Sequence, residues 1–192
     1  MSMSKQMKHI AAFVIPHACI ILFCMIMMLL NLATPFVSDY AIDTNGRVYV
    51  GEMRSIKILQ NSEIIGAIRT KSSTYAFTVD SNDNIVIAYP SVFYLLDRYG
   101  NVLERTEDFN STMYGQLQQN DNRFFTVNGD RYEMTNVLGW TQIVKNESEN
   151  VYSISVLSFC VKYLIQICSI SMFVNGIWVI HHVRRFHMND EK

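Results

Sequence analysis

Cysteine and histidine are absent from the long central part of this sequence, residues 36–150, since all four cysteines and all five histidines lie outside it. The segment therefore lacks the commonest general base and the commonest thiol nucleophile of enzymes. It also lacks the glycine motifs that bind phosphates or dinucleotides. We expect neither an enzyme nor a cofactor here. Because secreted eukaryotic domains of this size are often held by disulfides, the lack of cysteine also favours a bacterial protein.

Charged residues are scarce in two long apolar segments. Ile10–Leu32 has none, and Lys162 is the only one in Val151–Ile180. About 20 apolar residues in a helix cross the ~30 Å hydrocarbon core of a bilayer, so the sequence predicts transmembrane helices over residues 10–32 and 153–181. The first is expected to be an uncleaved signal anchor. A cleaved signal peptide is the alternative, although the apolar run is longer than such peptides carry and no A-x-A site follows it.

Basic residues near the ends of these segments set the expected orientation. Two precede the first segment and two follow the second: Lys5, Lys8, Arg184 and Arg185. Basic flanks favour the cytoplasmic side, so the tails, residues 1–9 and 182–192, are predicted to be cytoplasmic and residues 36–150 extracytoplasmic. The chain is then a two-pass protein of the cell membrane, with the lipid bilayer as one partner.

The central segment is mildly acidic, with ten Lys or Arg and fifteen Asp or Glu. Proteins that bind nucleic acid neutralise phosphates with basic residues. We therefore expect no nucleic acid partner.

The central segment also repeats itself with a shift of 37 residues. The shift aligns one unit with the next: Tyr40–Val50, Ile56–Leu59 and Ile64–Ile65 with Asp80–Ile87, Phe93–Leu96 and, after one inserted residue, Val102–Leu103. A third, more divergent unit runs from Asp121 to Val144. Apolar and polar residues alternate within the runs, and Asn, Asp and Gly separate them, as in short antiparallel strands joined by turns. A long period of this kind indicates a repeat architecture.

One such unit resembles a blade of the NHL type of β-propeller. The residues that carry the resemblance are Ile42-Asp43-Thr44-Asn45-Gly46-Arg47-Val48-Tyr49-Val50, Ile56–Leu59 and Glu63–Ile65, which are similar to the pattern V-D-x-x-G-x-I-Y-V, I-x-V-F-D and G-x-F. Val79-Asp80 through Leu103 is similar to the next blade. The resemblance implies blade-like sheets and no particular activity. The predicted fold class is membrane α plus all-β, with two transmembrane helices flanking an extracytoplasmic antiparallel β-meander of propeller-blade-like repeats.

Propellers close with four to eight four-stranded blades, whereas this segment has room for about three. Either the sheets stay open and something else covers their edges, or several copies complete a ring. Unpaired strand edges invite pairing.

Asp80, Asn82 and Asn84 have the spacing of the first half of a calcium-binding loop, in which alternate oxygens converge on one ion. The glycine and the glutamate expected at the sixth and twelfth positions are replaced by Ile85 and Ser91. We predict no metal site. The segment is interpreted, like Asp43–Gly46 one repeat earlier, as a hairpin turn whose side chains cap the backbone.

Small and polar residues recur along the second apolar segment at steps of three, four and seven: Ser155, Ser158, Lys162, Gln166, Ser169 and Gly176. These steps place them on one helical face, and such residues mark where transmembrane helices pack. The partner is either the first helix of the same chain or a helix of another membrane protein. Lys162 can alternatively snorkel to the interface.

These features favour a membrane-anchored extracytoplasmic β-repeat protein that binds or scaffolds, as an accessory subunit of a membrane complex. Its partner is another protein or further copies of this chain. The alternative is a sensory or regulatory subunit. Because the predicted tails are too short to hold an output domain, a signal would then pass through the helices of a partner.

Overall fold

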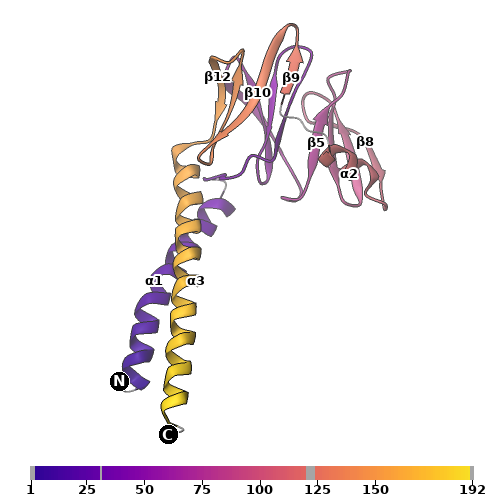
Figure 1. Ribbon diagram of the computed structural model, residues 1–192. Helices are drawn as coiled ribbons and strands as arrows, with labels where there is room; N and C mark the ends of the chain where they lie inside the picture. The colour runs from indigo at the N-terminus through magenta and orange to yellow at the C-terminus, as the bar shows by residue number, and fades with distance from the viewer. Residues whose placement is uncertain (1–2, 31, 120–123, 191–192) are drawn as a thin grey trace. The chain divides into compact units, whose positions relative to one another are not determined.

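The computed structural model describes residues 3–30, 32–119 and 124–190 of the chain. They form two compact units, one made of Met1–Pro35 with Val156–Lys192 and the other of Phe36–Ser155. The first unit contains two long helices, and the second contains three four-stranded antiparallel sheets (Figure 1). The predicted combination of two apolar helices with antiparallel β-structure is confirmed.

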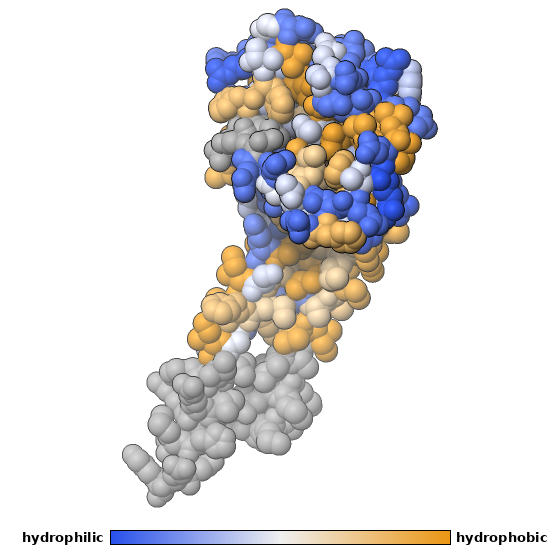
Figure 2. All heavy atoms as spheres, turned by 90° about the vertical axis from the view of Figure 1, so that its right-hand side faces the viewer, coloured by the Kyte–Doolittle hydropathy of each residue, from blue (hydrophilic) through white to orange (hydrophobic). Residues whose placement is uncertain are grey.

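The helical unit consists of α1 (Met3–Leu29) and α3 (Val156–Asp190). Each contains a stretch that is long and apolar enough to cross a membrane, Ala12–Leu29 in α1 and Val156–Trp178 in α3. The described side chains of both helices are mostly apolar on the face seen in Figure 2. Most of these side chains are exposed, because two helices alone cannot bury all of their apolar surface.

Contacts between α1 and α3 combine apolar packing with hydrogen bonds. Cys24, Ala33 and Val161 form a small buried cluster. His17 is bonded within the helix pair, because its Nδ1 lies 2.8 Å from the carbonyl oxygen of Phe13 and its Nε2 lies 3.2 Å from Ser171 Oγ.

The β unit contains the three sheets in chain order. Sheet A consists of β1 (Asp39–Ile42), β2 (Val48–Gly51), β3 (Ser55–Gln60) and β4 (Glu63–Arg69). Sheet B consists of β5 (Ala76–Val79), β6 (Ile85–Tyr89), β7 (Val92–Leu96) and β8 (Val102–Glu107). Sheet C consists of β9 (Phe124–Val127), β10 (Asp130–Val137), β11 (Trp140–Lys145) and β12 (Glu149–Ser153). Each is a meander in which neighbouring strands are also consecutive in the chain.

The repeat includes a β-bulge that recurs at the same place in every sheet. The pairing of the third strand with the fourth shifts between Ile58 and Leu59 in sheet A and between Leu95 and Leu96 in sheet B. These two positions are 37 residues apart, as the sequence alignment predicts. Sheet C has the same shift between Ile143 and Val144. Because a bulge bends and twists the strand that carries it, the fourth strands of the three units share a local geometry.

The third unit differs from its predicted boundaries. It was expected to end at Val144, but its fourth strand, β12, continues to Ser153. The β unit therefore extends beyond residue 150, and helix α3 starts at Val156 rather than at residue 153. The apolar run conceals this boundary, because Val151 and Tyr152 are buried strand residues that directly precede an apolar helix.

The β unit is also not purely β, since α2 (Thr112–Gln119) follows sheet B. This helix packs on β5 and β6, where Leu117 is buried with Ala76 and Ala88. Sheet A contacts both other sheets through β1, which lies against β5 and β9. Sheet B is therefore covered by sheet A on one face and by α2 on the other.

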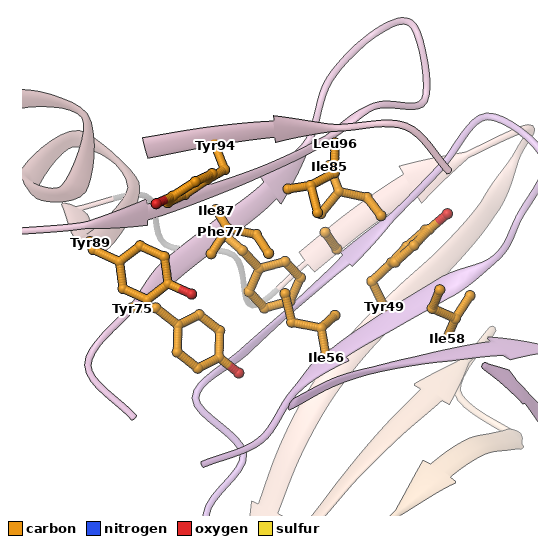
Figure 3. Packing of buried hydrophobic residues seen from close by; sticks show 11 residues of the cluster. Tyr49, Ile56, Ile58, Tyr75, Phe77, Ile85, Ile87, Tyr89, Tyr94 and Leu96 are labelled. Carbon is orange, nitrogen blue, oxygen red and sulfur yellow. The ribbon is translucent and has the colours of Figure 1, made fainter. Parts of the chain in front are cut away.

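Side chains along β6 point alternately to the two faces of sheet B, so that the sheet contributes to two apolar clusters. Ile85, Ile87 and Tyr89 belong to the core that sheet B shares with sheet A, whereas Val86 and Ala88 face the cluster around α2. The shared core is rich in aromatic and β-branched residues, which fit a pleated, buried surface. In Figure 3 its tyrosines Tyr75, Tyr89 and Tyr94 lie at one end, away from Tyr49 and Ile58. The residues buried in this core are Ala41, Tyr49, Ile56, Ile58, Tyr75, Phe77, Ile85, Ile87, Tyr89, Tyr94 and Leu96.

Gly51, the last residue of β2, allows the sheets to approach closely at this core. A Cβ atom at this position would lie 2.6 Å from Phe77 Cε1 and 2.6 Å from Ser38 Oγ. Both distances are too short for any side chain, so position 51 requires glycine for steric reasons.

Glu52, the residue after Gly51, connects all three sheets. Its carboxylate Oε1 accepts a hydrogen bond of 2.8 Å from the hydroxyl of Tyr152 in sheet C and pairs at 2.5 Å with Lys57 Nζ in β3. Its carbonyl oxygen accepts a hydrogen bond from the hydroxyl of Tyr75, which directly precedes β5. Burial, reinforced by the nearby Glu52 charge, raises the pKa of Tyr152 well above its usual value. Tyr152 therefore remains a hydrogen-bond donor.

Glu52→Ala is expected to lower the free energy of unfolding by roughly 1–3 kcal/mol, because it leaves the buried Tyr152 hydroxyl without its acceptor. Glu63→Ala is the matched control, because Glu63 is an exposed residue at the start of β4. The control should change stability by no more than about 0.5 kcal/mol. Thermal and chemical unfolding of the purified chain measure both values. Equal effects of the two substitutions would contradict this role of Glu52.

Candidate functional site

Asp80, Asn82 and Asn84, the calcium-loop candidates, form a hairpin turn between β5 and β6. Asp80 Oδ1 accepts hydrogen bonds from the backbone N–H groups of Asn82 and Asn84, both at 2.8 Å. Asp80 Oδ2 lies 3.3 Å from the Asn84 side-chain amide. In this geometry the Asp80 carboxylate binds its own turn.

The same turn occurs at two other places. Asp43 Oδ1 accepts from the backbone N–H groups of residues 45 and 47, and Asp97 Oδ1 accepts from those of residues 99 and 101. The fourth residue of each turn has a positive φ: 77° at Gly46, 63° at Asp83 and 88° at Gly100. Such side-chain capping is typical of Asp in tight turns.

The first turns of the three sheets meet at one edge of the β unit. Thr44 donates to the Asp83 carboxylate from its backbone N–H and from its hydroxyl, each at 2.8 Å, and the Asn45 side chain donates to it at 2.9 Å. The side-chain amide of Asn128, in the turn of sheet C, donates to the carbonyl oxygen of Thr44 at 2.8 Å. Hydrogen bonds from Thr44 hold the pKa of Asp83 below its usual value. These donors already occupy the Asp83 oxygens, and no group of three or more metal-binding side chains gathers anywhere in the described part of the chain.

The predicted packing stripe of α3 is divided between three environments. Ser158 is buried, and its hydroxyl accepts a hydrogen bond of 2.9 Å from the backbone N–H of Thr34. Lys162 is half-buried, and Ser155 precedes the helix. The other three residues, Gln166, Ser169 and Gly176, are exposed. We call these three the polar face of α3.

The side of α3 that packs on α1 is different. Val161 and Cys168 are its buried members, and Ile165 packs beside them. Asn175 is half-buried and donates to the carbonyl oxygen of Ser171 one turn earlier, which satisfies its amide within the helix. The predicted stripe therefore does not coincide with this packing side: Ser158 is buried and bonds Thr34, whereas Gln166, Ser169 and Gly176 are exposed.

The β unit also contains a pocket of about 350 Å³ between β4 of sheet A and strands β6, β7 and β8 of sheet B. Ile68 of β4 and Ile87 and Leu96 of sheet B make its apolar surface. Tyr89 and Tyr94 add aromatic rings from sheet B, where their rings pack edge to face at 6.0 Å (Figure 3).

Two basic residues, Arg69 and Lys71, line the same pocket, and both are exposed. Lys71 Nζ donates to the Tyr94 hydroxyl at 2.6 Å and lies 4.3 Å from the centre of its ring. The backbone N–H of Lys71 donates to the Tyr89 hydroxyl at 2.9 Å. The hydrogen bond from Lys71 lowers the pKa of Tyr94. Among the described residues, the lining of this pocket contains no Asp or Glu.

Sequence reasoning did not find this pocket, because its lining comes from separate stretches: the end of β4, the loop at Lys71, sheet B and the turn at Tyr99. The 37-residue repeat is the one sequence feature that could have pointed to this pocket. A shift of 37 places Tyr89 and Tyr94 at the positions of Glu52 and Lys57, so an ion pair in one unit is replaced by an aromatic pair in the next.

Comparison with known proteins gives no family for this chain. No protein-family model and no curated protein matches it. One similar solved structure is the crystal structure of a protein of unknown function from Bacteroides caccae, with 12% sequence identity and a TM-score of 0.33. The similarity covers 62% of this chain and 45% of that one. The chain therefore spans less than half the length of that protein, and the TM-score is too low to assign a shared fold.

Asp80→Ala is expected to destabilise the β unit by about 1 kcal/mol, because it removes the acceptor that caps the turn. Asp80→Asn is the matched control, since its side-chain oxygen can still accept from the same N–H groups. Excess calcium should leave the melting temperature of the wild-type chain and both variants unchanged. A calcium-dependent rise in the wild type that disappears in Asp80→Asn would show instead that Asp80 binds a metal.

Proposed function

We propose that this chain is an accessory subunit of a larger complex in a bacterial cell membrane. In this proposal α1 and α3 span the bilayer, both tails are cytoplasmic, and the β unit binds or positions a protein partner outside the cytoplasm. The observation that carries the proposal is the exposed polar face of α3.

Two features of the helices support the proposed membrane topology: their exposed apolar side chains and the basic residues at one end of each helix. Two helices expose mainly apolar side chains that a bilayer would cover. Basic residues lie at the ends of the helices that are proposed to be cytoplasmic, with Lys5 and Lys8 in the first part of α1 and Arg184 and Arg185 in the last part of α3.

The three sheets are proposed to be propeller-blade-like units. Their support is the recurrent bulge between the third and fourth strands and the shared strand order. One end of the β unit is covered by a helix. Helix α2 packs on the outer face of sheet B. Sheet C exposes polar and charged residues among a few apolar ones, with Arg131 placed over the exposed ring of Phe124. The covering of sheet B by α2 favours the open arrangement over a ring of several chains.

The polar face of α3 points to a partner within the bilayer. Gln166 and Ser169 are exposed on a helix surface that the hydrocarbon would contact. An amide placed in hydrocarbon without a hydrogen-bonding partner costs several kcal/mol. At Gly176, no described atom lies within 4 Å of where a Cβ would stand, so another helix can approach its backbone closely. A second helix with polar or small side chains would supply hydrogen-bond partners for Gln166 and Ser169 and would pack closely at Gly176.

A sensory or regulatory role is the second candidate. It is favoured by the same face of α3, because a change in the β unit could pass to a partner only through helix contacts. A pure scaffold and a regulatory subunit therefore share the docking surface and differ in whether a ligand outside changes the partner.

The topology can be tested by labelling single cysteines. Ser73→Cys introduces a thiol on an exposed loop of the β unit, and Ser2→Cys introduces one in the N-terminal tail. In a background whose four native cysteines are replaced by alanine, a membrane-impermeant maleimide added to spheroplasts should label position 73 at once and position 2 only after permeabilisation. The opposite pattern would refute the proposed orientation.

The docking proposal predicts that Gln166→Leu combined with Ser169→Leu reduces the co-purified partner at least fivefold. Ile167→Leu with Ile170→Leu is the matched control, because both residues are exposed on the same helix outside the polar face. Each tagged chain is extracted from its native host in mild detergent, and the complex is weighed by native mass spectrometry. A wild-type chain that is a bare monomer, or equal recovery with both double variants, would exclude an accessory subunit that docks through α3.

A further inference from the structure

We propose that the pocket between sheets A and B binds a small organic anion, a carboxylate carried on an aromatic ring or a short acyl chain. The inference concerns the β unit alone and is independent of any docking through α3. It rests on the size of the pocket, its apolar and aromatic surface, and the sign of its charged residues.

The size and surface of the pocket suit a small ligand with an apolar body. Its volume of about 350 Å³ lies at the lower end of the range of small-molecule sites, roughly 300–1,000 Å³. Ile68, Ile87 and Leu96 offer an apolar surface, to which the mostly buried rings of Tyr89 and Tyr94 add aromatic area. Tyr99 is 73% exposed and stands at the rim in the turn between β7 and β8.

The charge of the pocket is opposite to that of the domain around it. Residues 36–150 have an excess of acidic over basic residues, yet Arg69 and Lys71 are the charged groups among the residues that line the pocket. A cationic ligand would therefore meet only like charge there. An anion would meet two positive groups beside an apolar surface.

The two cations can bind a carboxylate in complementary ways. The guanidinium of Arg69 has a planar set of donors that suits both oxygens of a carboxylate. The Lys71 ammonium has three N–H donors, and the Tyr94 hydroxyl accepts one of them. That hydrogen bond holds the ammonium at the pocket and leaves two donors for an anion. The favoured ligand thus places its carboxylate near Arg69 and Lys71 and its body against Leu96 and the tyrosine rings.

Isothermal titration of the full chain in nanodiscs tests the inference with three carboxylates, namely indole-3-propionate, benzoate and hexanoate, and with indole-3-propionamide as the neutral counterpart. At least one carboxylate should bind saturably, and indole-3-propionate should bind at least tenfold more tightly than its amide. Lys71→Met and Arg69→Gln should each weaken carboxylate binding at least fivefold and leave amide binding unchanged. Arg131→Gln, on sheet C, is the matched control and should have no effect.

Val102→Trp serves as a second variant, because Val102 lines the pocket and is 58% exposed, so a larger ring there can fill the space without entering the core. It should abolish carboxylate binding while the melting temperature stays within a few degrees of the wild type.

Three results would overturn the inference: no saturable binding by any of the carboxylates, equal affinity for the acid and its amide, or binding that survives all three pocket variants. Tighter binding of the amide would show that the pocket selects a neutral ligand. Because partner recovery is measured separately, failure here would not affect the proposed docking of α3.

Discussion

The arrangement of the β unit depends on the need to satisfy one buried carboxylate. Glu52 is almost fully buried, and a buried charge is tolerated only when it is paired and hydrogen-bonded. Its partners come from different sheets, with Lys57 from sheet A and Tyr152 from sheet C, while its backbone carbonyl accepts from Tyr75 at the start of sheet B. In the observed arrangement the Glu52 carboxylate has both its hydrogen-bond donor and its counter-ion.

Equivalent positions in the first two repeats carry different side chains and make different contacts. The positions of Glu52 and Lys57 in the first unit correspond to Tyr89 and Tyr94 in the second. The charged pair ties the sheets together, whereas the aromatic pair lines a pocket where Lys71 binds both hydroxyl groups. Helix α2 then covers the face of sheet B that a further blade would need. The contacts proposed for the chain are with a small ligand in the β unit and, through the membrane helices, with another protein.

Much of this fold could be predicted from the sequence, because alternation and turn chemistry act locally. The first two units follow the 37-residue shift strand by strand, and Asp80 was correctly interpreted as a residue that caps a turn. The end of the third unit could not be predicted, because Val151 and Tyr152 continue directly into an apolar helix and hydropathy does not distinguish them. Helix α2 was missed because Thr112–Gln119 is mostly polar and buries only Leu117. The pocket and the environment of Glu52 depend on contacts between distant segments, and the spacing of residues along one strand contains no information about them.

The central claim, that the Glu52 carboxylate couples the sheets, is tested most directly by a double-mutant cycle between Glu52 and Tyr152. Free energies of unfolding are measured for the wild-type chain, Glu52→Ala, Tyr152→Phe and the double variant, by urea unfolding in detergent followed through the near-ultraviolet circular dichroism of the tyrosines. We expect a coupling energy of at least about 1 kcal/mol, because the effects of substituting two residues that share a buried hydrogen bond are not additive. Additive effects within about 0.3 kcal/mol would contradict it, since they would mean that sheets A and C are held together without this contact.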